Sequence, residues 1–275
     1  MKTAPALMPS LLAALIISLS ATPLAAQDLT AREIMVKVDD RDDGDNRIAE
    51  MQMVLTDKNG DTRIRKMKSF DKDLITDKGE EDRRRIMFFL EPADVKDTGF
   101  LTYDFDAYEK DDDQWLFLPA LKKTKRIAST DKSGSFMGSD FNYSDMTRKN
   151  LDAYDFKILK EADVRGAKTW VIEALPKTRE EMEQTGYKKS VVFVRQDNFI
   201  VVRAVHWTDT GDKLKYLDVT GLEKIDGVWT VTAMSMTTKK NKVTDHKTDM
   251  TFANVRYGQS LDDNLFTLRR LEKGL

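Results

Sequence analysis

The chain has 275 residues, and its 45 basic and 47 acidic residues give a formal net charge of −2. This near balance argues against nucleic acid as a partner, because nucleic-acid-binding domains concentrate basic charge on one surface. The sequence contains no cysteine. This excludes a disulfide scaffold and cysteine chemistry, so burial of apolar side chains must hold the fold together.

The first 26 residues have the layout of a secretory signal peptide. Lys2 supplies a positive start, Leu11–Ile17 an apolar stretch too short to span a bilayer, and "ATPLAAQ" a cleavage point near Ala26. No cysteine follows that stretch, so a lipid-anchored form is not expected. We predict an exported protein whose mature part, residues 27–275, forms a single domain with a net charge of −3, because only Lys2 is charged in the segment removed.

A short amphipathic helix is predicted directly after the cleavage point. Thr30 and Glu33 have the spacing of a capping box, in which each side chain bonds the backbone of the other residue. Ile34, Met35 and Val38 then fall on one apolar face.

Beyond this helix the pattern is typical of strands separated by turns. The turn signals include "KNG" at 58–60, Arg165-Gly166 and Asp226-Gly227. The predicted strands cover residues 49–55, 85–90, 100–105, 115–118, 123–127, 154–160, 169–175, 190–195, 199–207, 214–219, 228–237 and 243–255.

Two further helices are predicted among and after these strands. "TREEMEQT" carries a second capping box at Thr178 and Glu181, and "LDDNLFTLRRLEKGL" places four leucines on one face: Leu261, Leu265, Leu268 and Leu271. Helices so few and so amphipathic must lie against a sheet. We therefore predict an α+β protein, built on one curved antiparallel sheet that short helices cover in part.

The sequence offers little for catalysis, and we predict no catalytic residue. The only histidines, His206 and His246, lie in predicted strands, and no serine has the G-x-S-x-G context of a nucleophile elbow. An exported hydrolase that depends on His206 is kept as a minor alternative.

No metal site or cofactor is predicted. Asp39, Asp43, Gly44 and Glu50 fall at calcium-loop positions, but Arg41 stands where a ligand is needed. The acidic loop is therefore expected to be solvated.

The most unusual run is "DKSGSFMGSDFNYSDM" at residues 131–146. It lacks the Walker lysine, and Asp140 would repel a phosphate. We interpret its glycines and serines as turn formers and predict a folded flap beside the mouth of a barrel that the curved sheet would form. The expected anchors of the flap are Phe136, Met137, Phe141 and Tyr143, with Ser144 as the cap of a short helix.

Several strands are apolar on both faces, including "IMFFL" at 86–90 and "WLFL" at 115–118. A sheet with water on one side needs only one apolar face, so helices cover the second face or the sheet curls around a cavity. The predicted helices are short, which favours the cavity. Methionines, which suit varied apolar partners, are frequent in these strands.

The segment "WLFLPALKKTKRIASTDKSGSFMGSDFNYSDM", with "DRDDGD" and "YKKSVVFVRQDNFIVVRAV", closely resembles the bacterial outer-membrane lipoprotein-sorting protein family. That family belongs with the carrier LolA and its receptor LolB. The resemblance implies an open, incomplete antiparallel β-barrel with short helices on one side and an apolar interior for acyl chains. It also implies a periplasmic location.

From the resemblance and the two-sided strands we expect a non-enzymatic periplasmic carrier or chaperone for a lipid or a lipoprotein acyl chain. Its partners would be an inner-membrane RND-type transporter or an outer-membrane acceptor, and the alternative is a sensor or protein-interaction module with no lipid cargo. A shift of strand phase by one residue would exchange lining residues for outward-facing ones. The ligand contacts predicted are Met51, Met53, Phe88, Trp115, Phe117, Met234 and Met236.

Overall fold

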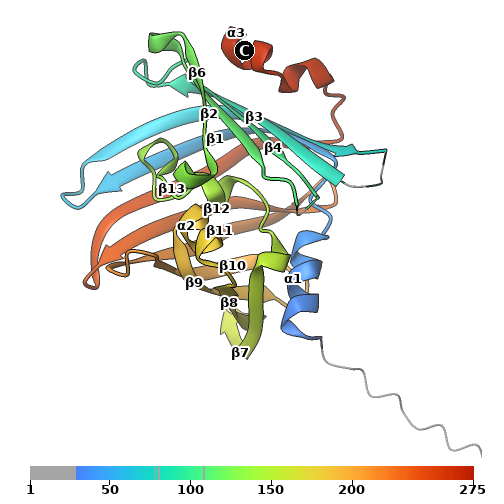
Figure 1. The fold of residues 1–275 in the computed structure, drawn as a ribbon, viewed down its shortest axis with the longest axis vertical. Coiled ribbons are helices and arrows are strands. Elements are labelled where there is room, and N and C mark those ends of the chain that lie inside the picture. The colour runs from blue at the N-terminus through green and yellow to red at the C-terminus, as the bar shows by residue number, and fades with distance from the viewer. Residues whose placement is uncertain (1–28, 78, 80, 108) are drawn as a thin grey trace, which may run out of the picture.

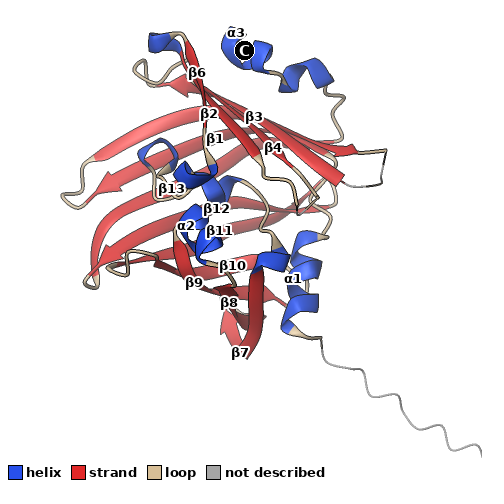
Figure 2. Ribbon diagram, viewed as in Figure 1, coloured by secondary structure: helices blue, strands red, loops and turns tan. Residues whose placement is uncertain are grey.

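The computed structural model describes residues 29–77, 79, 81–107 and 109–275; the predicted signal peptide and its cleavage point lie outside them. In the described part thirteen strands form one antiparallel sheet accompanied by short helices (Figures 1 and 2). No helix in these residues is long and apolar enough to cross a membrane. The strands are β1 Asn46–Asp57, β2 Thr62–Ile75, β3 Glu81–Glu91, β4 Gly99–Asp104, β5 Asp113–Leu118, β6 Lys123–Arg126, β7 Tyr154–Val164, β8 Ala167–Pro176, β9 Tyr187–Arg195, β10 Val201–Thr208, β11 Lys213–Ile225, β12 Val228–Lys240 and β13 Val243–Tyr257.

The strands form two meanders that meet where β1 pairs with β13. From β1 the strands follow in chain order to the edge strand β6, and from β13 they follow in reverse order to the opposite edge strand, β7. Within the described residues these two edges do not pair with each other, so the sheet is open and not a closed barrel. This confirms the predicted open, incomplete antiparallel barrel.

The predicted turn at 58–60 joins β1 to β2, but β2 itself is missing from the predicted strands. Its two ends are exposed, and only the stretch from Met67 to Asp71 is largely buried. Lysine and arginine occupy many of its remaining positions, which hides the period-two alternation of a strand.

Helix α1, Ala31–Asp39, has the predicted capping box at Thr30 and Glu33. The Glu33 backbone N–H donates to Thr30 Oγ1 (3.2 Å), and the Thr30 N–H donates to Glu33 Oε2 (2.8 Å). The buried side chains of Ile34 and Met35 pack against β8, β9 and β10. This helix therefore covers part of the second meander.

Helix α2, Arg179–Thr185, also begins at the predicted cap, Thr178. Only half of its predicted capping box forms. The Glu181 N–H donates to Thr178 Oγ1 (3.1 Å), but the Glu181 carboxylate accepts a hydrogen bond from the Tyr154 hydroxyl (2.6 Å) and so ties α2 to β7.

The predicted C-terminal helix is divided into a 3₁₀ turn, Asp263–Phe266, and helix α3, Leu268–Lys273. Phe266 and Leu271 are fully buried while Leu268 is exposed, so the predicted face of four leucines is wrong. The Leu271 side chain lies so close to β4 that a Cβ at Gly99 would meet its Cδ1 at 2.6 Å. Residues 261–275, here the C-terminal segment, cover one face of the first meander, which we call the outer face (Figure 1).

The other face, here the inner face, is covered by the chain between the two edge strands. Residues 127–153, the crossing segment, must pass from β6 to β7, because these lie at opposite edges of the sheet. Figure 1 shows this segment within the curve of the sheet. Its buried side chains pack with those of β1, β3, β4, β12 and β13 into the largest apolar cluster of the described protein.

Candidate functional site

The crossing segment is held inside the sheet by aromatic side chains. Phe136 is 1% exposed and Phe141 is 4% exposed. The Phe136 ring lies edge-on to Phe100 of β4, with centroids 5.0 Å apart, and to Tyr143 at 5.7 Å. The segment therefore fills part of the space that the curved sheet encloses.

Asp140 fastens the same segment to the second meander. Its buried carboxylate accepts hydrogen bonds from the hydroxyls of Thr238 and Thr248 and lies 2.7 Å from His246 Nδ1. Lys215 Nζ donates to the Asp140 backbone carbonyl (2.7 Å). Asp140, whose charge made a phosphate site improbable, thus docks the crossing segment on β12 and β13.

The predicted flap anchors lie on the inner face, two of them deeply buried and two, Met137 and Tyr143, partly buried. Tyr143–Met146 forms a 3₁₀ turn whose cap is Asn142, so the predicted cap, Ser144, is wrong. The Asn142 side chain also donates a hydrogen bond to the Thr185 carbonyl at the end of α2 (2.9 Å). Movement of this segment as a flap stays a prediction.

An apolar cavity of about 250 Å³ lies between the crossing segment and the sheet. We call it the apolar chamber. Three charged residues and one serine, Arg47, Arg85, Asp145 and Ser69, join its wall. The apolar lining residues are Met51, Met87, Phe136, Phe141, Met146, Val231, Met234, Met250 and Phe252.

A second cavity, of about 320 Å³, shares Phe141, Asp145 and Met234 with the apolar chamber. Leu217 and Met236 add to its apolar wall, while its other side is polar and carries His206 and Lys149. Together the two cavities make an apolar path beneath the crossing segment, and polar side chains interrupt this path.

The structure brings together four of the seven predicted ligand contacts. Met51, Met53, Met234 and Met236 lie in the inner-face cluster, and all but Met53 line one or both cavities. Side chains of a strand alternate between its two faces. Met51 and Met53 are two residues apart, as are Met234 and Met236, so both members of each pair lie on the same face.

The other three, Phe88, Trp115 and Phe117, lie on the outer face against the C-terminal segment. In β3 it is Met87 and Phe89 that face inward. The predicted phase of β3 and β5 is therefore off by one residue, since both strands are apolar on both faces.

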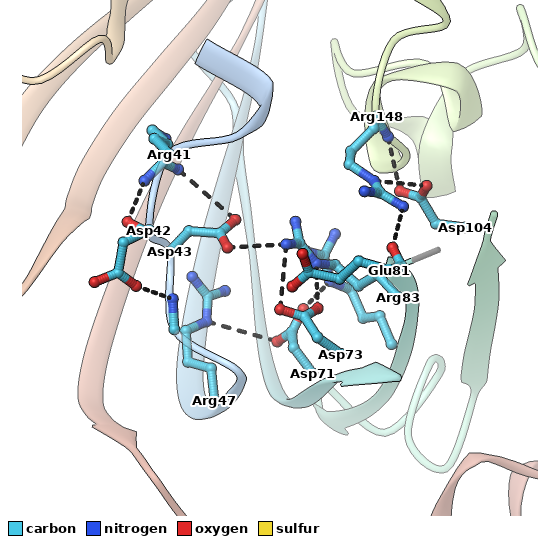
Figure 3. A network of polar contacts seen from close by, with 12 residues as sticks. Arg41, Asp42, Asp43, Arg47, Asp71, Asp73, Glu81, Arg83, Asp104 and Arg148 are labelled. Atoms are coloured by element: carbon cyan, nitrogen blue, oxygen red, sulfur yellow. Dashed lines mark hydrogen bonds and ion pairs between the residues drawn. The ribbon is translucent and has the colours of Figure 1, made fainter. Parts of the chain in front are cut away.

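Figure 3 shows a network of charged side chains that was not predicted from the sequence, and residues of this network also line the apolar chamber. Arg83 Nε lies 2.7 Å from Asp73, and Arg83 Nη2 lies 2.8 Å from Asp43. Asp43 of the acidic loop, which was expected to be solvated, therefore forms an ion pair. Among the described residues no group of three His, Cys, Asp or Glu side chains is placed to hold a metal. The network surrounds a cavity of about 270 Å³, here the arginine pocket, whose charged lining residues are Arg41, Asp43, Arg47, Asp71, Asp73, Arg83, Arg85, Asp104, Asp145 and Arg148.

The arginine pocket and the apolar chamber have Arg47, Arg85, Asp145, Met146 and Val231 in common. One continuous wall thus changes from charged to apolar. The signal in the sequence is the replacement of alternate charged residues by alternate apolar ones along a single strand, as in Arg83, Arg85 and Met87.

The two histidines take different partners. His206 Nδ1 lies 2.8 Å from the hydroxyl of Ser190, which is 2% exposed, whereas His246 contacts Asp140. Burial, aided by Lys149 and Lys215, lowers the pKa of His206 to about 3. The imidazole is therefore neutral at physiological pH, and the contacts described for it do not include the carboxylate of a Ser-His-Asp triad.

The buried His206 should make the protein less stable in mild acid. Between about pH 6.5 and 3 the unfolded chain binds a proton at this residue that the folded chain does not bind, so stability is lost as the pH falls through this window. The slope approaches about 1.4 kcal/mol per pH unit. Urea unfolding of the wild type and His206→Gln from pH 7.5 to about 4.5 measures the difference. Other groups also titrate in this range, such as Asp39, where burial raises the pKa to about 6. These groups affect the wild type and the variant alike, so the difference between the two proteins reports on His206. Parallel stability curves would contradict the assignment.

The comparisons with known proteins agree with this architecture. A family model described as an uncharacterized protein matches residues 81–273. A DUF1329 family protein from Desulfovibrio piger is 30% identical, with 88% of this chain and 97% of that chain covered and a TM-score of 0.79. A domain from Vibrio parahaemolyticus whose name refers to outer membrane lipoprotein sorting is also 30% identical, covering 88% and 98%, with a TM-score of 0.77.

A LolA superfamily protein from Nitrosomonas europaea shares 18% identity over 88% of this chain and 100% of that chain, with a TM-score of 0.65. At this identity the similarity is one of fold, and it confirms the LolA-like fold that the sequence resemblance implied. No curated protein matches the chain. The match to the Desulfovibrio piger protein, at 30% identity over 88% of this chain and 97% of that chain, shows that the chain belongs to the DUF1329 family.

Proposed function

We propose that the protein is a periplasmic carrier that shields the apolar chain of a lipid or a lipoprotein between the curved sheet and the crossing segment. The single observation that supports this most is the methionine-rich apolar chamber on the inner face. Methionine side chains adapt to varied apolar partners, and each buried methylene of a ligand contributes about 0.8 kcal/mol. No bond is made or broken in this function.

The names of the solved relatives support the same proposal, since one of them refers to outer membrane lipoprotein sorting. In this proposal residues 1–26 direct export, and an inner-membrane RND-type transporter or an outer-membrane acceptor loads or unloads the carrier. Native mass spectrometry of protein purified from the periplasm, followed by lipid extraction, tests for the cargo. Protein that carries no lipid and takes up none in vitro would overturn the proposal.

Filling the cavities should weaken the binding of an apolar ligand. Met234 lines both, so Met234→Trp is expected to weaken binding of methyl laurate by at least about tenfold, because the indole displaces several methylenes of the chain. Isothermal titration calorimetry measures the affinity. Ile75→Trp is the matched control, since Ile75 is 73% exposed at the end of β2. Equal affinities for the two variants, both with wild-type melting temperatures, would place the ligand elsewhere.

The second candidate is a protein-interaction module of the same fold with no lipid cargo. The open sheet favours it, because the edge strands β6 and β7 each have one strand neighbour in the described residues and the free side of an edge can pair with an extended peptide. Affinity capture from envelope extracts separates the candidates: a stoichiometric protein partner without bound lipid supports the module.

A further inference from the structure

The register of four neighbouring strands places charged and apolar residues in successive rows across the inner face. In the first row Arg47 pairs with Asp71, Asp71 with Arg85, and Arg85 with Thr102. Two residues further along each strand the next row contains Ala49, Ser69, Met87 and Phe100. Since a strand rises about 3.3 Å per residue, the wall changes from charged to apolar within about 7 Å.

Polar atoms without partners gather at this change. Ser69 is fully buried and Thr102 is 1% exposed, and each hydroxyl lacks a hydrogen-bond partner among the described residues. Arg47 Nε and Asp71 Oδ2 also lack one and face each other at 3.6 Å, beyond hydrogen-bond distance. A buried polar group without a partner costs free energy, so the two hydroxyls and Arg47 Nε are placed to donate hydrogen bonds to a ligand that enters the cavity.

In the charged row itself two arginines face a single carboxylate, which leaves one positive charge in excess. Arg47 and Arg85 share one carboxylate, that of Asp71, whose burial at 7% exposure keeps water from screening the pair. The other acid of the apolar chamber, Asp145, takes hydrogen bonds from the Asn142 N–H (2.7 Å) and the Tyr187 hydroxyl (2.9 Å) and pairs with neither arginine.

Two other arginines of the arginine pocket already have close ionic partners, and Arg41, which lies 4.0 Å from Asp43, does not line the apolar chamber. Arg83 contacts Asp43 and Asp73, and Arg148 contacts Asp104 at 3.1 Å. Arg47 differs from these arginines, because its one ionic contact in the described protein is the long one to Asp71. Its guanidinium therefore keeps donors for a carboxylate or a phosphate group, either of which arginine can bind with two parallel hydrogen bonds.

We infer that the ligand is an amphiphile with a single hydrocarbon chain and an anionic head. Its chain lies in the apolar chamber among Met51, Met87 and Met250, and its carboxylate or phosphate oxygens accept hydrogen bonds from the Arg47 guanidinium and the Ser69 hydroxyl. This inference rests on the proposed carrier function and adds the chemistry of the head group.

Three probes with the same chain length test it by isothermal titration calorimetry on the mature protein: laurate, dodecyl phosphate and methyl laurate. The wild type is expected to bind at least one anionic probe about tenfold or more tightly than the neutral ester, the effect of a charge-assisted hydrogen bond. The tighter of the two identifies a carboxylate or a phosphate head.

In Arg47→Gln the ratio of anionic to neutral affinity should fall to about one, whereas Arg165→Gln should keep the wild-type ratio. Arg165 is the matched control because it pairs with Asp218 at the surface. Asp71 keeps its contact with Arg85 in the first variant, so the fold should survive. Should the variant fail to fold, Ser69→Ala provides the test, with an expected reduction of the ratio by about threefold.

A wild-type ratio of one, or an unchanged ratio in Arg47→Gln or in Ser69→Ala, would overturn the anionic head while leaving the carrier in place. Failure of all three probes to bind would instead overturn the carrier function itself.

Discussion

Replacing Asp140 with alanine is expected to lower the free energy of unfolding by about 3–5 kcal/mol, the loss typical of a broken buried polar network. The change leaves the hydroxyls of Thr238 and Thr248 and the imidazole of His246 without their shared acceptor. Urea denaturation followed by circular dichroism measures the loss.

The matched control is Asp131→Ala in the same crossing segment. The Asp131 side chain is about half exposed and pairs with Lys125 at 3.3 Å on the surface, so the expected change is within about 0.5 kcal/mol. If the two variants unfold at the same urea concentration, Asp140 does not anchor the segment.

Phe136→Ala should destabilise the protein by a similar amount, about 3–5 kcal/mol, because truncation of a fully buried phenylalanine leaves a cavity. The lost contacts are with Phe89, Phe100 and Tyr143. Thermal unfolding by calorimetry checks the prediction, with Leu121→Ala as control, since Leu121 is 62% exposed. A loss below about 1 kcal/mol would mean that the segment packs loosely.

Phe136 and Asp140 hold the same segment by different means, so their effects should not be additive. Once either side chain is removed, the other has less native structure to stabilise. The double variant is therefore expected to lose less than the sum of the single losses, and strict additivity would indicate that the two contacts act independently.

Most of the fold could be predicted from the sequence because turns and alternation are local signals. The helix cap at Thr30, the turn at 58–60 and most of the strands depend on residues within a few positions of one another. Strand β2 was missed because its charged side chains, among them Arg65 and Lys68, obscure that alternation. The pairing of β1 with β13 has no local signal at all.

The candidate site was predictable only where one face of a strand differs from the other. The alternation around Met51 and Met234 places these methionines correctly on the inner face, whereas "IMFFL" carries no phase information and Phe88 was assigned to the wrong face. The junction of Arg47, Ser69 and Arg85 comes from three strands, and only their register brings it together.

The pairing of β1 with β13 also determines when the protein can fold. The seam at the middle of the sheet joins the first strand of the described residues to the last, for example Met53 to Met250. If the chain emerges from the export machinery with its N-terminal part first, the first meander can form early, but β1 then presents an unpaired edge until β13 follows. Such distant pairing slows folding. Until the fifteen residues of β13 are available to pair with β1, the protein should depend most on factors that protect exposed strand edges.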